Sequence, residues 1–158
     1  MRGVGSLIVE IEDDSLCFGT DGVITGRIFL RCGDTCFPEA SWNDFAAVVL
    51  TWWVEAILAL DESACAPKEL RFMDGPFWAE VSNDETDSLR FQFVDGRARS
   101  LKILSSGIAK AGEFKKSLLT TSERLLRAAE SRRFSSTELD RLREATGVLS
   151  GCHRSCDC

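Results

Sequence analysis

The residues best suited to chemistry lie in the last eight of the chain, GCHRSCDC. Cys152, His153, Cys156 and Cys158 fall close together there, and His153 is the only histidine in the sequence. Thiolate sulfur and imidazole nitrogen are ligands that zinc prefers. Four such side chains could in principle complete a tetrahedral zinc site.

The spacing of these four residues argues against zinc. Structural zinc sites usually take two ligands from each of two separated segments, so that the metal closes a loop. Cys152 and His153 are adjacent instead, and adjacent side chains point apart in an extended chain. A zinc site, a disulfide within the tail and exposed thiols prone to oxidation all remain open. We expect exposed thiols and no bound cofactor.

The rest of the sequence offers no catalytic motif. With one histidine and no tyrosine, carboxylates are the general bases that remain. The glycines of GTDGVITG match neither a dinucleotide fingerprint nor a phosphate loop. Cys32 and Cys36 are separated by three residues, one more than in the redox motif, although they could meet across a turn. We therefore expect no enzymatic activity; an enzyme that uses carboxylates alone stays an alternative.

Composition limits the class of protein and its partners. A chain of 158 residues fits one domain with a substantial core. Its 44% hydrophobic and 28% charged residues are typical of a folded globular protein. The net charge of −6 disfavours nucleic acid and anionic membranes as partners, and favours a basic protein or a cation.

Seven cysteines, an odd number, occur without a secretory context. The opening residues include an apolar run of only Leu7 to Val9, which is too short for the hydrophobic region of a signal peptide. We therefore expect a cytoplasmic protein in which most cysteines are free thiols.

The first half of the chain predicts strands and then one central helix. Apolar and polar residues alternate over 7–12 and 24–32, and a short strand between them at 16–18 would complete a meander. Residues 41–60 predict a helix that opens with a capping box of Ser41 and Asp44. Trp52 and Trp53 belong to its broad apolar surface, so we expect core on most sides of it. Glu55 interrupts this run, which argues against a membrane span.

The second half predicts further strands followed by helices. Period-two alternation indicates strands at 70–72, 77–81, 89–93 and 98–103. Helical spacing follows over 109–133, and a capping box of Ser135 and Glu138 opens a last helix that Gly147 should end. The sequence thus predicts an α+β fold, an antiparallel sheet of about five to seven strands packed against the Trp-rich helix and the C-terminal helices. Residues 1–150 would form one domain, and 151–158 a flexible Cys-rich tail.

A resemblance to a known group rests on two motifs. The helix opening S-W-x-D-F leads into paired tryptophans, and the turn F-x-D-G-P-F-W follows at Phe72–Trp78 between two strand pairs. Over residues 7–105 this looks like small bacterial immunity-type proteins of polymorphic toxin systems. The resemblance implies a cytoplasmic inhibitor that binds a toxin domain, commonly a basic nuclease. That group has no shared catalytic residues to transfer to this chain.

The sequence places a partner-binding site at the acidic loop SNDETD. Asp84, Glu85 and Asp87 lie within four residues, and Trp78 and Glu80 lead into them on the strand face opposite the predicted core. An aromatic anchor beside carboxylates is typical of an interface hot spot with a charged rim. We therefore predict a non-catalytic protein-binding module. A metal-binding or redox-sensing protein that uses the Cys/His tail is the alternative.

Overall fold

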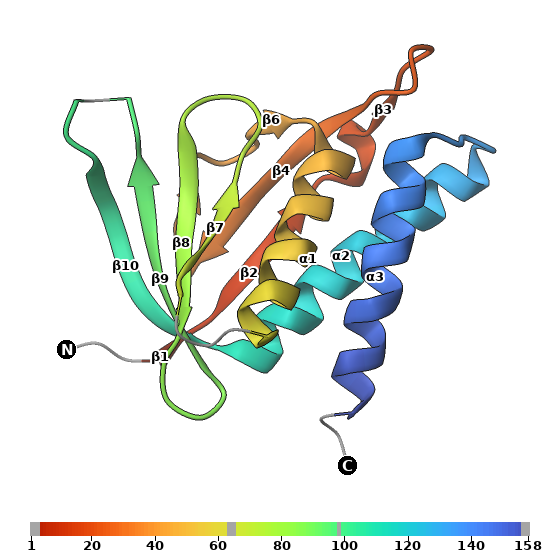
Figure 1. The fold of residues 1–158 in the computed structure, drawn as a ribbon. Helices are drawn as coiled ribbons and strands as arrows, with labels where there is room; N and C mark the ends of the chain where they lie inside the picture. Colours follow the sequence, from red (N-terminus) through yellow and green to blue (C-terminus); the bar gives the residue numbers. More distant parts are fainter. Residues whose placement is uncertain (1–3, 63–65, 98, 156–158) are drawn as a thin grey trace.

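The computed structural model describes residues 4–62, 66–97 and 99–155, and these confirm an α+β fold (Figure 1). Three α-helices run over Ala46–Glu62 (α1), Ala111–Ser131 (α2) and Thr137–Ser155 (α3). A 3₁₀ turn spans Asp13–Ser15. The strands form two sheets rather than one, which we call sheet A and sheet B.

Sheet A has the strand order β1-β10-β9-β8-β7. Its last four strands in this order are antiparallel neighbours, whereas β1 pairs with β10 in parallel. The register between β10 and β9 shifts between Ile103 and Ser105, which marks a bulge. The strands are β1 (Val4–Gly5), β7 (Lys68–Arg71), β8 (Phe77–Asn83), β9 (Ser88–Asp95) and β10 (Lys102–Lys110).

Sheet B is built around β4, its longest strand. The order β2-β4-β3 puts β4 in the centre, so the predicted meander is wrong, and β5 and β6 also pair with β4. Only Ser6 separates β1 in sheet A from β2 in sheet B, so the two sheets meet at this residue. The strands are β2 (Leu7–Ile11), β3 (Cys17–Phe18), β4 (Ile24–Cys32), β5 (Thr35–Phe37) and β6 (Asn43–Asp44).

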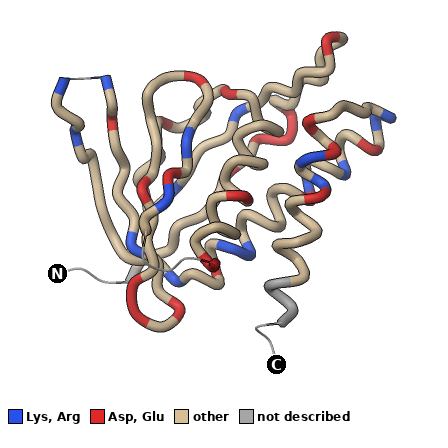
Figure 2. Tube along the Cα trace, in the orientation of Figure 1, with Lys and Arg blue, Asp and Glu red and all other residues tan. Residues whose placement is uncertain are grey.

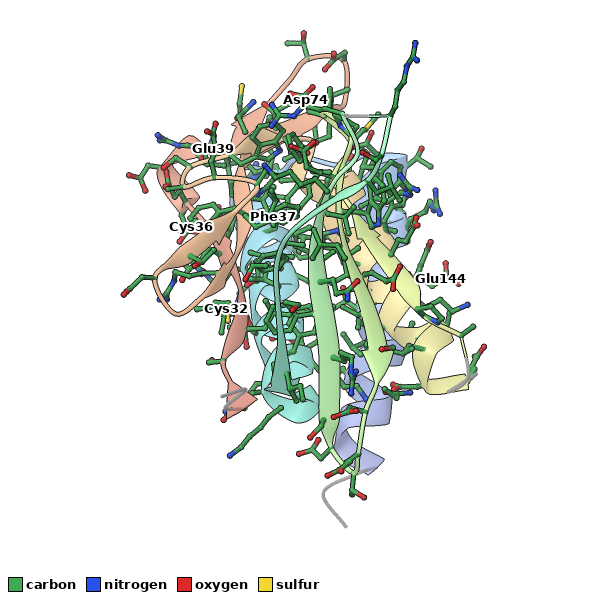
Figure 3. The ribbon with its side chains drawn as sticks, turned by 90° about the vertical axis from the view of Figure 1, so that its left-hand side faces the viewer. Cys32, Cys36, Phe37, Glu39, Asp74 and Glu144 are labelled. Atoms are coloured by element: carbon green, nitrogen blue, oxygen red, sulfur yellow. The ribbon has the colours of Figure 1, made fainter. Side chains whose placement is uncertain are left out.

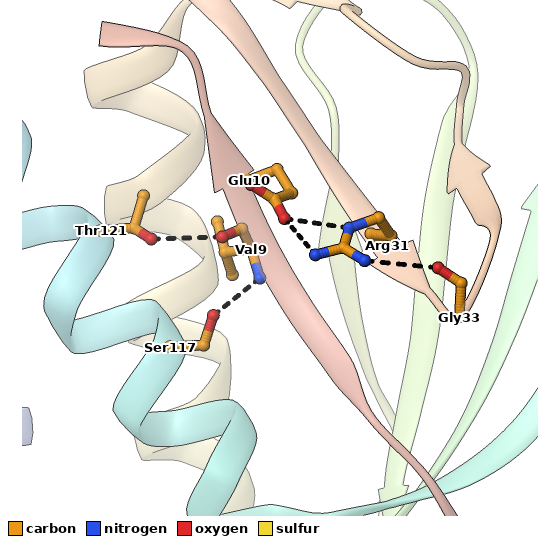
Figure 4. A network of polar contacts seen from close by, with 6 residues as sticks. All are labelled: Val9, Glu10, Arg31, Gly33, Ser117 and Thr121. Atoms are coloured by element: carbon orange, nitrogen blue, oxygen red, sulfur yellow. Dashed lines mark hydrogen bonds and ion pairs between the residues drawn. The ribbon is translucent and has the colours of Figure 1, made fainter.

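Helix α2 covers the edge of sheet B at β2 (Figure 4). The Ser117 hydroxyl oxygen accepts a bond from the Val9 N–H at 2.8 Å, and the Thr121 hydroxyl donates to the Val9 carbonyl at 3.3 Å. On the other side of β2, Glu10 binds the Arg31 guanidinium of β4 at 2.7 Å. Side chains of α2 thus bind the backbone groups that an edge strand would otherwise leave unpaired.

The core lies between α1 and the inner faces of the two sheets. Trp53 is fully buried, and its ring contacts Phe72 with centroids 5.1 Å apart. Trp52 is only half-buried, beside Glu138 and Arg141 of α3. The prediction of a Trp-rich central helix is therefore right for Trp53, whereas Trp52 lies at the junction between α1 and α3.

The beginning of α1 differs from the predicted capping box. Ser41 has a φ of 60° and its hydroxyl donates to Glu12 rather than to the helix. Asp44 belongs to β6, and its carboxylate accepts the backbone N–H groups of Phe45 and Asp74 and the indole N–H of Trp42. This buried carboxylate thus joins the start of α1 to the turn between β7 and β8.

The last helix begins and ends later than the sequence predicted. Ser136 rather than Ser135 caps α3, because the Ser136 hydroxyl accepts the Leu139 N–H at 3.3 Å. Gly147 does not end the helix, which continues to Ser155. A glycine inside a helix costs only about 1 kcal/mol relative to alanine, and the packing of α3 against α1 and α2 outweighs that.

Candidate protein-binding surface

One face of sheet A carries no described helix. In Figure 1 the three helices lie to the right of this sheet, and in Figure 3 its strands lie in front of α2 and α3. Strand alternation turns Ala79, Val81, Phe91 and Phe93 into the core, so the intervening side chains point the other way. We call this second side the outer face; it comprises Glu69, Arg71, Trp78, Glu80, Ser82, Arg90, Gln92, Val94, Ile103, Ser106 and Ile108.

Trp78 lies on the outer face, as predicted, but it does not protrude from it. The Arg71 guanidinium lies over the face of the Trp78 ring, 5.0 Å from the ring centroid, and Trp78 is only 9% exposed. Gly96 approaches it so closely that a Cβ there would lie 2.6 Å from the indole. The prediction that Trp78 is an aromatic anchor for a partner is therefore wrong, because the side chain is buried. Trp78 supports the face, in a cross-strand row with Val94 and Ile103.

Glu80 lies half-buried in the next row of the outer face. Its cross-strand neighbours are Glu69 of β7 and Gln92 of β9. Glu69 binds Arg71 at 2.6 Å, whereas Glu80 has no ion pair within the described ranges. Its carboxylate is therefore not engaged in an ion pair among the described residues and can contact a partner.

The predicted acidic loop joins β8 to β9, and two of its three carboxylates already have internal partners. Asp84 binds Arg90 at 2.9 Å. The Asp87 carboxylate accepts the N–H of Gly112 at 3.1 Å, and its backbone carbonyl accepts that of Ala111 at 3.0 Å. Asp87 therefore caps the start of α2. Of the loop's carboxylates, only that of Glu85 is left without a partner among the described residues.

We expect the replacement of Asp87 by alanine to lower the free energy of unfolding by about 1–2 kcal/mol, since it removes a cap and its charge from a helix N-terminus. The φ of 58° at this position adds to the loss, because alanine tolerates it less well than aspartate. Urea unfolding measures the change. Asp87→Asn, which keeps an acceptor and tolerates this φ, is the matched control and should lose less; equal losses would contradict the capping role.

Sequence reasoning missed a cluster of exposed large apolar side chains at the β9–β10 hairpin, three of the five such side chains in the described part of the chain. Leu101, Ile103 and Leu104 are 64%, 54% and 46% exposed, and we call them the hairpin patch. The one signal in the sequence was the break in alternation at Ile103-Leu104, which coincides with the bulge. Nothing in the sequence shows that β10 lies near the edge of its sheet.

Basic residues surround the hairpin patch. Arg97 turns back over the Phe77 ring and binds Asp95 at 2.6 Å, which holds the pKa of Asp95 below its usual value. Arg99 and Lys102 are exposed and form no ion pair within the described part of the chain. Sheet A therefore has ends of opposite charge, the acidic β8–β9 loop at the bottom of Figure 2 and the basic hairpin at its upper left.

The Cys/His tail lies mostly outside the described residues. Cys152 and His153 fall within α3, but their side chains are not described, and Cys156 and Cys158 lie beyond the described range. Within the described ranges no three histidine, cysteine or acidic side chains gather to hold a metal ion. The predictions of a flexible tail, of a zinc site and of exposed thiols therefore stay predictions.

The register of the β4–β5 hairpin separates Cys32 from Cys36. Cys32 is opposite Thr35 and Cys36 is opposite Arg31, so the two cysteine side chains leave opposite faces of the hairpin (Figure 3). Both are free thiols, as is Cys17. Burial raises the pKa of the Cys32 thiol and so lowers its reactivity.

A polar groove of about 450 Å³ runs between β2 and α2. Its hydroxyl groups come from Ser6, Ser117, Thr120 and Thr121, and those of Ser117 and Thr121 already bind the Val9 backbone. Two of its charged groups are also occupied, since Glu10 binds Arg31 and Arg124 binds Asp13 at 2.8 Å. Half of the polar side chains in its lining thus have internal partners, and those of Ser6, Glu113, Lys116 and Thr120 have none among the described residues.

Burial raises the pKa of two carboxyl groups, Asp44 and Glu138. Asp44 accepts hydrogen bonds from the start of α1 and the β7–β8 turn. Glu138, in the first turn of α3, has one carboxylate oxygen without a hydrogen-bond partner, and Asp21 raises its pKa further. The two groups belong to different elements and neither is on the outer face of sheet A.

Comparisons of this chain with protein-family models, with curated proteins and with solved structures give no match. Among the described helices, none combines the length and the apolar character that a bilayer crossing requires.

Proposed function

We propose that this protein is a non-catalytic protein-binding module. The observation that carries the proposal is the hairpin patch at the end of a helix-free sheet face. Three large aliphatic side chains, each close to half exposed or more, lie within four residues there. Clustered apolar side chains rimmed by charge are typical of protein interfaces, whereas scattered single ones are not.

The energetics of docking favour this end of the outer face. Full burial of a leucine or isoleucine side chain contributes about 1.5–3 kcal/mol, so covering three half-exposed ones contributes several kcal/mol in total. Ile103, one of these three side chains, is held in the cross-strand row with Trp78 and Val94, on a sheet whose other face is packed in the core. A rigid platform loses little entropy on binding, which leaves more of that free energy as affinity.

The specific form of the proposal follows from the resemblance to immunity-type proteins. In that form the protein is a cytoplasmic inhibitor that binds a toxin domain stoichiometrically. A basic toxin would meet Glu80 and Glu85, the carboxylates near the β8–β9 loop that have no ion pair within the described residues. The hairpin patch would then contribute the apolar part of the same interface.

The experiment is a calorimetric titration of this protein with a toxin domain encoded beside its gene, together with a growth assay in cells that express the toxin. We expect a one-to-one complex and rescue of growth. Ile103→Ser should weaken binding about tenfold or more, since it removes a central apolar contact. Val148→Ser is the matched control, since Val148 on α3 is 52% exposed and Ile103 is 54% exposed. This variant should leave binding unchanged.

Two outcomes would contradict these proposals separately. The absence of any complex and of any rescue would overturn the immunity function. A complex that Ile103→Ser and Val148→Ser affect equally would show that the interface lies away from the hairpin patch.

A further inference from the structure

We infer that the free edge of β10 binds an extended, acidic segment of the partner protein as an added strand. This inference rests on the proposed function and deepens it, because it names the mode of binding and the chemistry of the partner. It depends on three features of the β9–β10 hairpin: an unpaired stretch of strand edge, the hairpin patch beside it, and two basic side chains without ion pairs within the described ranges.

The first feature is the unpaired edge. On its inner side β10 pairs with β9 along nearly its whole length, but on its outer side β1 reaches only Ile108 and Ala109. The stretch 102–107 therefore has no partner on that side among the described residues. Exposed strand edges accept a further strand readily, because their N–H and C=O groups already point outward in register.

The hydrogen-bonding pattern between β10 and β9 shows which backbone N–H and C=O groups of β10 point toward the free edge. The Ala111 N–H donates to the Asp87 carbonyl directly opposite at 3.0 Å, in the register that continues the pairing of β10 with β9. Antiparallel pairs alternate between bonded and non-bonded, so Gly107 and Ser105 bind β9 and Ser106 does not. The N–H and C=O of Ser106 consequently face the free edge.

The second and third features define the occupant. In a strand added here, every second side chain would point to the side of the sheet on which Ile103 and Leu104 are exposed. Those side chains of the added strand should therefore be apolar. Arg99 and Lys102 are exposed at the same end, in a protein whose net charge is −6. The complementary segment therefore alternates apolar residues with carboxylates.

Charge argues against a second copy of this chain as the occupant. Pairing of β10 with β10 around a two-fold axis is antiparallel, so Arg99 and Lys102 of one copy would meet only a strand that carries Lys102 and Lys110 and no acidic residue. The bulge between Ile103 and Ser105 and the lysine on the edge are devices that limit self-pairing of edge strands. A partner segment that supplies carboxylates does not meet the charge obstacle, and its backbone has to fit the bulge.

The test uses amide NMR shifts of the full chain titrated with two ten-residue peptides, one alternating valine with glutamate and one alternating valine with lysine. We expect the glutamate peptide to bind at least about tenfold more tightly, with the largest shifts at Ile103, Ser106 and Gly107. The Ser106 amide should also gain protection from hydrogen exchange.

Two pairs of variants separate the backbone from the charge. Ser106→Pro removes the outward N–H and should abolish binding, whereas Ser106→Ala keeps that N–H and should preserve it. Arg99→Glu should remove the preference for the glutamate peptide. Lys116→Glu makes the same change of charge at an exposed site on α2 and should leave the preference intact. Circular dichroism before titration verifies that each variant is folded.

Several results would overturn the inference. They are failure of the glutamate peptide to bind at millimolar concentration, equal binding of the two peptides, or equal effects of the two Ser106 variants. Dimerisation through β10 in sedimentation experiments, or binding to phosphatidylserine vesicles in place of the peptide, would assign the edge to another occupant. Because these peptides contain no toxin sequence, such a failure leaves the stoichiometric complex of the proposed function to be judged by its own titration.

Discussion

Replacement of Trp53 by alanine is expected to lower the free energy of unfolding by about 3–5 kcal/mol, the usual cost of truncating a buried tryptophan. Trp53 is fully buried, and its ring packs edge-on against Phe72 at 5.1 Å. Its indole N–H also donates to the Arg71 carbonyl at 2.7 Å, which ties α1 to β7. The substitution therefore opens a cavity and leaves a carbonyl without its donor.

Urea denaturation followed by circular dichroism measures this loss. Trp52→Ala on the next position of α1 is the matched control, and it should cost clearly less because Trp52 is half-buried at the junction with α3. Trp53→Phe keeps most of the ring volume but loses the N–H, so it should fall between wild type and Trp53→Ala. Equal losses in the Trp52 and Trp53 alanine variants would show that Trp53 has no special place in the core.

Replacement of Asp44 by alanine is expected to lower the free energy of unfolding by about 3 kcal/mol or more. The carboxylate accepts the Phe45 N–H at 2.7 Å, the Asp74 N–H at 3.1 Å and the Trp42 indole N–H at 3.1 Å. Each donor left unsatisfied in a buried place costs about 1–3 kcal/mol. Urea unfolding at neutral pH tests the value. A loss below about 1 kcal/mol would show that water replaces the carboxylate.

The same residue gives the stability a pH dependence of known sign. Burial raises the pKa of Asp44 above its ordinary value of 3.8, so the folded state binds its proton more tightly than the unfolded state. The contribution of Asp44 to stability is therefore full below pH 3.8 and is lost as the pH rises through the folded-state pKa.

We therefore compare the free energies of unfolding of wild type and Asp44→Asn. Their difference, wild type minus variant, should decrease as the pH rises over this range, even if the two proteins differ in stability at the lowest pH. Urea unfolding at several pH values from about 3.5 upward measures the difference. A difference that increases with pH would mean that the three donors lower the pKa of Asp44 more than burial raises it.

The sequence determined the identity of most elements, because alternation and helical spacing are local properties of the chain. The strands β2, β4, β8 and β9 and the helices α1 and α2 lie within a few residues of the predicted ranges. The α+β class follows from their order. The elements that the sequence missed, β1, β5 and β6, are each only two or three residues long, which is too short to show a period. The strand predicted at 98–103 was placed too early, since β10 covers Lys102–Lys110.

Local patterns also placed Trp78 and Glu80 on the correct face of β8, since strand alternation decides the face. They did not decide exposure, which depends on neighbours distant in sequence. Arg71 and Gly96 cover Trp78 from two other segments, and the β8–β9 loop lies against the start of α2, so Asp87 serves that helix. A charge that looked free in the sequence thus has a partner that only the fold supplies.

Tertiary structure alone decided where apolar side chains remain in water. Trp52 and Trp53 are adjacent in an apolar helix, and only the packing of α3 makes one half-buried and the other core. Leu101 and Ile103 belong to the strand predicted at 98–103 and Leu104 follows it, but β1 pairs only with Ile108 and Ala109 and leaves the neighbouring stretch of β10 at an edge. The physical reason is the same in both cases. A hydrophobic side chain is more stable when buried, but the packing of helices and strands determines which hydrophobic side chains another element covers.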